Sequence, residues 1–180
     1  MLPVSKKKIA TIWMDGCSGC HMSFLDLDHR LLDLADLIEI VHSPIVDHKE
    51  FPPDVDVTLV EGAVSSDEDY EKIVKVRART KILVAMGDCA VSANVPAMRN
   101  RFTPKALQEA VYLAPNMARP QLPHEAVPTL LPRVRPVHEV VKVDVFVPGC
   151  PPSNDTLFYV LSELIHGRMP DLSNKTRFGA

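Results

Sequence analysis

The sequence lacks the features that mark a membrane-spanning, exported or nucleic-acid-binding protein. Its longest apolar runs, such as Ile82–Met86, are far shorter than the roughly 20 residues that a membrane helix needs. Lys and Arg together number 20 against 23 Asp and Glu, and the pI is about 6.1, so there is no basic excess for nucleic acid. The first residues include a lysine run but no apolar signal core and no twin arginine. We therefore expect a cytoplasmic protein that binds neither membrane nor nucleic acid.

Cysteine is scarce as well, with four residues: Cys17, Cys20, Cys89 and Cys150. Because thiols are kept reduced in the cytosol, such a small set indicates metal or redox chemistry there more often than a disulfide framework. The 180 residues are enough for one domain with a real core and too few for two comfortable ones. Since the sequence has no internal repeat and no low-complexity linker, we expect a single domain over residues 1–180.

Segments with the periodicity of strands alternate along the chain with segments that have the periodicity of helices. The expected strands are Lys8–Met14, Ile38–His42, Val55–Val60, Lys81–Met86 and Val141–Val147. One helix is expected to begin at Ser23, and others to cover Ser66–Arg79, Lys105–Tyr112 and Asn154–His166. This alternation predicts an α/β fold, a flavodoxin-like doubly wound parallel sheet of about five strands with helices on both faces.

The four cysteines all follow predicted strands at the point where a strand ends. Cys17 and Cys20 come after the first strand, Cys89 after the fourth and Cys150 after the fifth. The carboxyl ends of the strands in an open α/β sheet meet at the edge where ligands bind, so we expect the thiols to share one crevice. Flanking glycines permit unusual backbone and let peptide N–H groups approach the sulfurs: Gly16, Gly19, Gly87 and Gly149. The pattern indicates the complete ligand set of one iron–sulfur cluster and therefore an electron-transfer protein.

Three other interpretations of the cysteines stay open at this point. A thiol–disulfide oxidoreductase would place Cys17 and Cys20 after a strand and at a helix start, as here, but it would not need the two later cysteines in matching positions. A structural zinc site also uses four thiolates, although such sites usually pair two short Cys-x₂₋₄-Cys knuckles and this chain has one. Finally, Cys89 and Cys150 could be buried core residues without any metal.

The residues around the cysteines resemble a known family. The three motifs are Gly16-Cys17-Ser18-Gly19-Cys20-His21-Met22-Ser23-Phe24-Leu25-Asp26, then Gly87-Asp88-Cys89-Ala90 with Val95-Pro96-Ala97-Met98-Arg99-Asn100, and finally Pro148-Gly149-Cys150-Pro151-Pro152. They are similar to the motifs of nickel–iron hydrogenase small subunits, above all the short small subunit of the bidirectional NAD-reducing hydrogenases. This resemblance implies that Cys17, Cys20, Cys89 and Cys150 hold a proximal 4Fe–4S cluster.

Two departures from related proteins refine this placement. Respiratory and periplasmic small subunits carry a twin-arginine leader and a C-terminal extension with two further clusters, whereas this sequence has no cysteine after Cys150. The resemblance therefore implies one cluster at most. The related quinone-reductase subunit of respiratory complex I has two adjacent cysteines in its first motif, whereas Ser18 and Gly19 separate them here. This difference favours the hydrogenase branch.

By resemblance, the whole enzyme is a hydrogen dehydrogenase, which oxidises hydrogen and reversibly passes the electrons to NAD. This subunit would have no catalytic residue. It would take electrons from the nickel–iron site of the large subunit and pass them to diaphorase subunits that carry flavin and further iron–sulfur clusters. FMN in this subunit is the one other cofactor that the resemblance suggests. Against FMN, the cysteine pair occupies the first strand–helix loop, where a flavin phosphate would bind helix N–H groups.

Two features outside the ligand set have a functional interpretation. The proline-rich stretch 112–136 is long for a loop in a compact domain but keeps apolar residues such as Tyr112 and Met117, so we expect it to face a partner. Of the seven histidines, only His21 adjoins a motif. Because the cysteine set is already complete, we expect a surface or structural role for His21 rather than metal ligation.

Overall fold

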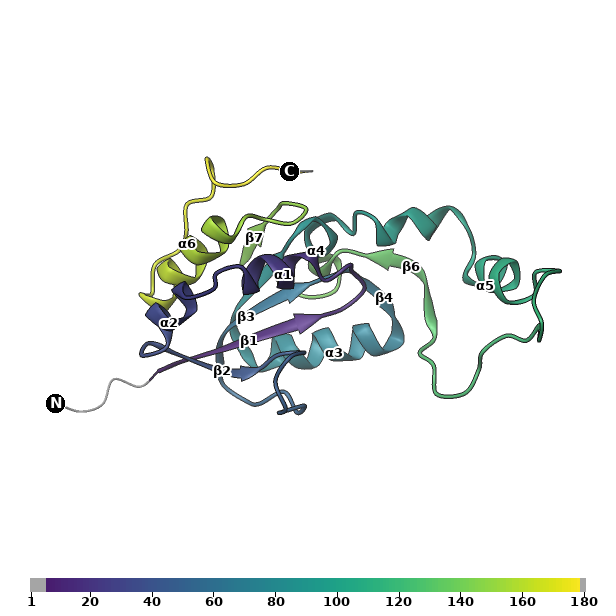
Figure 1. The fold of residues 1–180 in the computed structure, drawn as a ribbon, viewed down its shortest axis with the longest axis horizontal. Coiled ribbons are helices and arrows are strands. Elements are labelled where there is room, and N and C mark those ends of the chain that lie inside the picture. Colours follow the sequence, from purple (N-terminus) through teal and green to yellow (C-terminus); the bar gives the residue numbers. More distant parts are fainter. Residues whose placement is uncertain (1–5, 179–180) are drawn as a thin grey trace.

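A parallel sheet of five strands forms the centre of the computed structural model, which describes residues 6–178 (Figure 1). Its strands are β1 (Lys7–Trp13), β2 (Ile38–His42), β3 (Val55–Glu61), β5 (Thr80–Met86) and β7 (Val145–Val147). They lie in the order β2-β1-β3-β5-β7, which is the order of flavodoxin-like sheets. The predicted fold class is therefore confirmed.

Helices cover both faces of this sheet and enclose an apolar core on each side. They are α1 (Gly19–Leu25), α2 (Arg30–Leu34), α3 (Asp67–Ala78), α4 (Asp88–Ser92) and α6 (Asn154–Ile165). On one face α1, α2 and α6 bury side chains such as Phe24 and Leu161, and on the other α3 and α4 bury Ile73 and Ala90. No helix within residues 6–178 is long and apolar enough to cross a membrane.

Local sequence signals explain where α3 begins and ends. The hydroxyl of Ser66 accepts from the backbone N–H of Asp69 at 3.1 Å, and the Asp69 carboxylate accepts from the N–H of Ser66 at 3.1 Å. This reciprocal pair is a capping box. Acidic residues in the first turn and basic residues in the last turn, Lys75 and Arg77, match the helix dipole.

Two elements near the cysteines differ from the expectation. The first helix begins at Gly19, before Ser23, and Ser23 does not cap it. Instead, the hydroxyl of Ser23 donates to the backbone oxygen of Pro152 at 2.5 Å, so a tertiary hydrogen bond takes the place of the predicted local cap. The last strand is shorter than predicted because its pairing with β5 begins only at Val145.

A second, two-stranded sheet was not expected from the sequence. In it β4 (Val64–Ser66) pairs antiparallel with β6 (Leu130–Arg135). The 3₁₀ helix η1 (Pro96–Arg101) holds β6 in place, since Arg99 Nη1 donates to Leu131 O at 3.1 Å and Asn100 pairs with both backbone groups of Val134. A short 3₁₀ helix, η2 (Val137–Glu139), then leads towards β7. Within the stretch 112–136, which was expected to be a loop, residues Leu130–Arg135 therefore form a strand.

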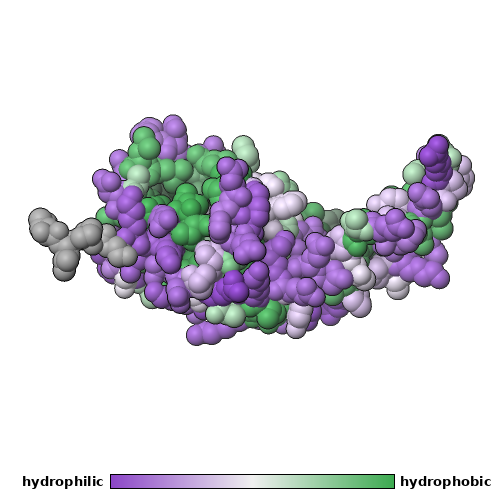
Figure 2. Space-filling model, turned by 90° about the horizontal axis from the view of Figure 1, so that it is seen from below, coloured by the Kyte–Doolittle hydropathy of each residue, from purple (hydrophilic) through white to green (hydrophobic). Residues whose placement is uncertain are grey.

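Between η1 and β6 the chain forms an arm, residues 102–129, which stands off the body at the right of Figure 1. The first element of the arm is α5 (Pro104–Tyr112), which nearly coincides with the predicted helix Lys105–Tyr112. None of the residues of α5 is buried, and Phe102 and Val111 are 58% and 59% exposed. Figure 2 shows the same arm projecting from the right of the body. Within residues 6–178, Leu107 of α5 is half-buried, while Val111 and Tyr112 stay exposed.

Candidate functional site

The four cysteines lie on three loops that leave the carboxyl ends of β1, β5 and β7. Cys17 follows β1, and Cys20 is in the first turn of α1. Cys89 is in the first turn of α4, directly after β5, and Cys150 follows β7. All are free thiols: Cys20 is buried, Cys89 is half-buried, and the other two are exposed. The predicted ligands are therefore at the sheet edge that the sequence indicated.

Gly87 brings the three loops into contact. A Cβ atom built on Gly87 would lie 2.2 Å from the sulfur of Cys20 and 3.5 Å from the backbone oxygen of Gly149. The φ angle of Gly87 is +85°, which L side chains rarely adopt. Only glycine fits this position without displacing the sulfur of Cys20.

Hydrogen bonds fix the second and third loops to each other. The N–H of Gly87 donates to Val147 O at 2.8 Å, and the N–H of Asp88 donates to Gly149 O at 2.9 Å. In return, the carboxylate of Asp88 accepts from the N–H of Gly149 at 2.7 Å. Asp88 is buried, so its side chain serves as a connector between the loops that carry Cys89 and Cys150.

The sulfurs influence one another's ionisation. Burial raises the pKa of the Cys20 thiol, and the charges of Glu61 and of the other three thiols raise it further. Burial also raises the pKa of Cys89 to about 11, although a hydrogen bond from the backbone of Val95 acts in the opposite direction. Reactive cysteines of thiol–disulfide enzymes have lowered pKa values. The electrostatics at Cys20 and Cys89 are the reverse of that pattern.

A buried acid that the sequence analysis did not single out lies among the cysteine loops. Glu61, the last residue of β3, is 1% exposed, and β3 runs between β1 and β5. Its Oε2 accepts from the backbone N–H of His21 at 2.9 Å and also pairs with His21 Nδ1. His21 is buried by this pairing, which gives it the structural role expected. A charged residue that closes an apolar strand at the ligand-binding edge was the available signal for Glu61.

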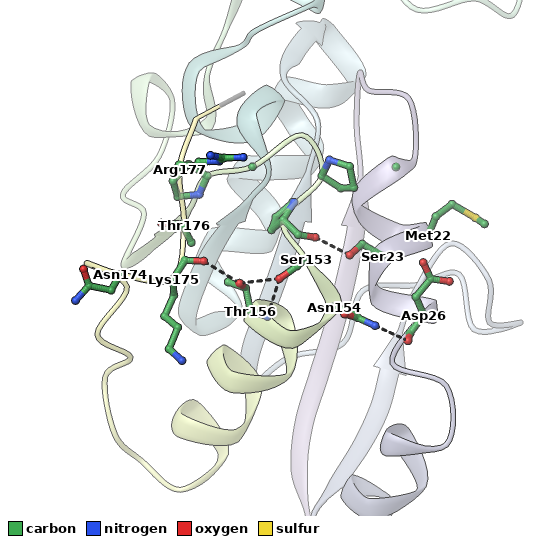
Figure 3. Close-up of a pocket in the computed structure, with 15 residues that line it drawn as sticks. Met22, Ser23, Asp26, Ser153, Asn154, Thr156, Asn174, Lys175, Thr176 and Arg177 are labelled. Atoms are coloured by element: carbon green, nitrogen blue, oxygen red, sulfur yellow. Dashed lines mark hydrogen bonds between the residues drawn. The ribbon is translucent and has the colours of Figure 1, made fainter. Parts of the chain in front are cut away.

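A cleft of about 720 Å³ opens beside the loop of Cys150 (Figure 3). One wall is α1 with Met22 and Ser23, and the opposite wall is the chain segment 174–177. Thr156 Oγ1 donates to Lys175 O at 2.9 Å, which holds this segment against the start of α6. Figure 3 shows the hydrogen bond from Ser23 to the backbone oxygen of Pro152. The cleft therefore gives access to the cysteine loops from the side of α6.

The donor set fits an iron–sulfur cluster. Four thiols are the ligands that a 4Fe–4S cluster takes, and the Nδ2 group of Asn94 lies 4.0 Å from Cys150 Sγ as a weak donor. No group of three or more His, Cys, Asp or Glu within residues 6–178 is placed to hold one metal ion. This finding concerns single ions, since a cluster distributes its four thiolates over different irons. The loop of Cys17 and Cys20 fills the place after β1 where a flavin phosphate would bind.

Known proteins resemble this chain in sequence. Residues 17–164 match the family described as NADH ubiquinone oxidoreductase, 20 Kd subunit. The chain is 42% identical over 172 residues to the NAD-reducing hydrogenase HoxS subunit delta of Cupriavidus necator, an alignment that covers 93% of this chain and 82% of that protein. It is 31% identical over 163 residues to the sulfhydrogenase 2 subunit delta of Pyrococcus furiosus, where the alignment covers 91% of this chain and 64% of the relative.

Solved structures resemble it as well. A chain from the crystal structure of an NAD⁺-reducing NiFe hydrogenase in the H₂-reduced state superposes with a TM-score of 0.92 at 38% identity, covering 97% of this chain and 99% of that one. A NiFeSe hydrogenase chain from Dm. baculatum superposes with a TM-score of 0.60 at 20% identity, covering 97% of this chain and 70% of that one. The second likeness shows a shared fold alone.

Proposed function

The chain belongs to the family of the 20 kDa subunit of NADH ubiquinone oxidoreductase, and we propose that it holds one 4Fe–4S cluster as the electron-transfer small subunit of an NAD-reducing nickel–iron hydrogenase. The resemblance stated from the cysteine motifs is confirmed by the family match and by the relatives. In this function Cys17, Cys20, Cys89 and Cys150 are the cluster ligands, and bond-making chemistry belongs to the large subunit. When bound, a cluster of this kind accepts and releases electrons.

The observation that carries the proposal is the meeting of the three cysteine loops at Gly87. The backbone of Gly87 lies against the sulfur of Cys20 and near the carbonyl of Gly149, so motifs far apart in the sequence form one site. The hydrogen bonds of Asp88 and Ser23 hold the loops in register before any metal binds. Because a preset ligand set loses little freedom when it binds, such bonding supports a resident cofactor rather than a chance cluster of thiols.

Unequal exposure of the ligands suits transfer of electrons to another protein. Cys20 is buried, while Cys17 and Cys150 are exposed, so one side of the site faces the core and the other faces outward. Met22, in α1, and Val95, at the start of η1, are each 59% exposed. Apolar side chains around a redox site are what a docking partner would cover. We call the surface around Cys17, Cys150, Met22 and Val95 the cysteine rim. We assign it to the large subunit that carries nickel and iron.

The arm offers a second docking face. Isolated helices as short as α5, with nine residues, are marginal in water, and the rest of this chain fully buries none of the residues of α5. Its exposed apolar residues, with those of the segment 112–129, fit a surface that another subunit covers. Since the cysteine rim is assigned to the large subunit, we assign the arm to the diaphorase module. A cytoplasmic location and the absence of FMN from this subunit stay predictions.

Metal analysis combined with activity tests the function. The chain, purified after reconstitution with iron and sulfide, should contain one 4Fe–4S cluster and should show no hydrogen-dependent dye reduction until the large subunit is added. Zinc in place of iron would support the structural-zinc interpretation. Appreciable disulfide-reductase activity without bound metal would support the thiol–disulfide interpretation. Hydrogen turnover by the chain alone would contradict the assigned division of labour.

A further inference from the structure

Glu61 holds both ends of the loop that carries Cys17 and Cys20. Its backbone oxygen accepts from the N–H of Met14 at 2.9 Å, just before the loop. Its side chain accepts from the backbone N–H of His21 at 2.9 Å and from His21 Nδ1, directly after the loop. One residue at the end of β3 therefore fixes the chain on either side of the first two cysteines.

The side chain of Glu61 also forms the floor of this loop. A Cβ atom on Gly16 would lie 3.6 Å from Glu61 Oε1 and 3.2 Å from Gly62 Cα, so the carboxyl group packs against the glycine before Cys17. Burial of a carboxyl group is costly unless its hydrogen bonds are satisfied. Glu61 Oε1 and His21 Nε2 are nevertheless buried and have no hydrogen-bond partner among the described residues. An incompletely bonded buried acid calls for an explanation beyond packing.

We propose that Glu61 is a positioning residue for the cluster: it presets the Cys17–Cys20 loop before iron arrives, and its carboxylate adds negative charge beside the bound cluster. The first part concerns the chain alone, while the second part rests on the proposed function. The carboxyl group lies beside the site, since Oε1 packs against Gly16, next to Cys17, and Oε2 accepts from the N–H of His21, next to Cys20. Negative charge near a cluster disfavours its reduction.

Three variants separate this role from a general loss of stability. Glu61→Gln keeps the shape and one oxygen acceptor for the His21 N–H but removes the charge, while Glu61→Ala removes both. Thr58→Ala is the matched control, because Thr58 is a fully buried residue of the same strand whose hydroxyl is bonded to Thr80 at 2.8 Å, away from the cysteine loops. Glu61→Ala and Thr58→Ala each remove a buried polar group from β3, and only the two Glu61 variants change a residue that contacts the Cys17–Cys20 loop.

Hydrogen exchange in the metal-free full chain tests the first part without any cluster. The His21 amide should exchange about tenfold faster or more in Glu61→Ala, as expected for loss of a hydrogen bond to a charged acceptor. In Glu61→Gln and Thr58→Ala it should stay near the wild-type rate. An unchanged rate in Glu61→Ala would overturn the proposal. Because iron is not involved, this measurement decides about Glu61 even if the wild-type chain binds no cluster and the proposed function fails.

Metal content and redox titration of the reconstituted chain test the second part. Glu61→Gln should hold as much iron and sulfide as the wild type, with a midpoint potential shifted to a less negative value. Glu61→Ala should lose much of its iron, which Thr58→Ala should not. A wild-type potential in Glu61→Gln would refute the electrostatic role. If Glu61→Ala and Thr58→Ala lose iron equally for the same loss of stability, Glu61 has only an ordinary structural role.

Discussion

Gly87 lies against the sulfur of Cys20 so closely that a Cβ atom on the glycine would be 2.2 Å from that sulfur. The contact joins the loop after β5 to the first turn of α1, although β3 separates their strands in the sheet. A backbone without a side chain is therefore part of the ligand geometry. The proposed cluster site depends on this missing side chain as much as on the thiols themselves.

Substitution of Gly87 by alanine should accordingly remove the site. Both Gly87 and Gly167 have a positive φ, +85° and +75°, but a Cβ on Gly167 would meet nothing within 4 Å. Gly87, at φ +85° and ψ 161°, has a conformation that is essentially confined to glycine, so its alanine should cost about 1–3 kcal/mol of stability. Gly167→Ala should cost about 1–2 kcal/mol. Only Gly87→Ala should also displace Cys20 and lose most of the iron, measured per chain after reconstitution. Equal iron in the two variants would show that the contact with Cys20 does not matter.

Loss of any one ligand should disrupt the cluster. Cys89→Ser replaces a soft thiolate by a hydroxyl that binds iron poorly, so most of the cluster's visible absorbance and its full iron content should disappear. Ser92→Ala, in the same helix, removes a hydroxyl that is bonded to Asp88 O at 2.9 Å and serves as the control. A full cluster in Cys89→Ser together with its loss in Cys17→Ser would contradict the model with four ligands.

The sequence was sufficient to predict the sheet and the meeting of the cysteines. Within β5, Ile82–Met86 is a continuous apolar run, as expected for a strand buried on both faces. Alternation with helices then fixes parallel strands, whose carboxyl ends must share one edge. The positions of Cys89 and Cys150 therefore followed from topology, although 61 positions separate them (150 − 89).

What the sequence did not reveal depends on contacts between distant residues. β6 contains Pro132, and a proline argues against a strand when only the sequence is known. The pairing of β6 with β4 is apparent only in three dimensions. The start of α1 was misplaced because Ser23 is bonded to Pro152 rather than to its own helix. Glu61 was passed over for the same reason, since its partner His21 comes from another loop.

Asp144 should make stability depend on pH through the strand that leads to Cys150. Its carboxylate accepts from the N–H of Leu83 at 2.9 Å and from Arg77 Nη1 at 2.5 Å. Burial alone would raise its pKa, but these hydrogen bonds outweigh burial and hold the pKa of Asp144 below the ordinary value of 3.8. A carboxylate with a lowered native pKa stabilises the fold above its unfolded pKa, and this contribution is lost as the pH falls through the native value.

We therefore expect Asp144→Asn to lower the free energy of unfolding by about 1–3 kcal/mol at pH 7. The difference from the wild type should shrink once the pH falls below about 4. Urea denaturation at pH 7, 5 and 3 measures it, with Asp47→Asn at an exposed position as the control. A difference that stays constant over this range would show that the charge of Asp144 does not contribute.

The arm should be needed for assembly and not for folding. Val111 and Leu113 are 59% and 42% exposed, so Val111→Asp and Leu113→Asp should change the stability of the chain by no more than about 0.5 kcal/mol. If the arm docks the diaphorase module, a charge in its apolar surface should cost about 2 kcal/mol or more of binding, as truncation of a central interface residue does. Leu32→Asp is the control, since Leu32 is 74% exposed on α2, outside the arm.

Two assays and size exclusion measure the effect of the arm variants. Hydrogen-dependent NAD reduction should fall, and the diaphorase subunits should be lost from the complex on size exclusion. Hydrogen-dependent dye reduction by the remaining pair of subunits should persist. Loss of the large subunit instead would reverse the assignment of the two faces, and an intact complex in both arm variants would show that the arm is not a docking surface.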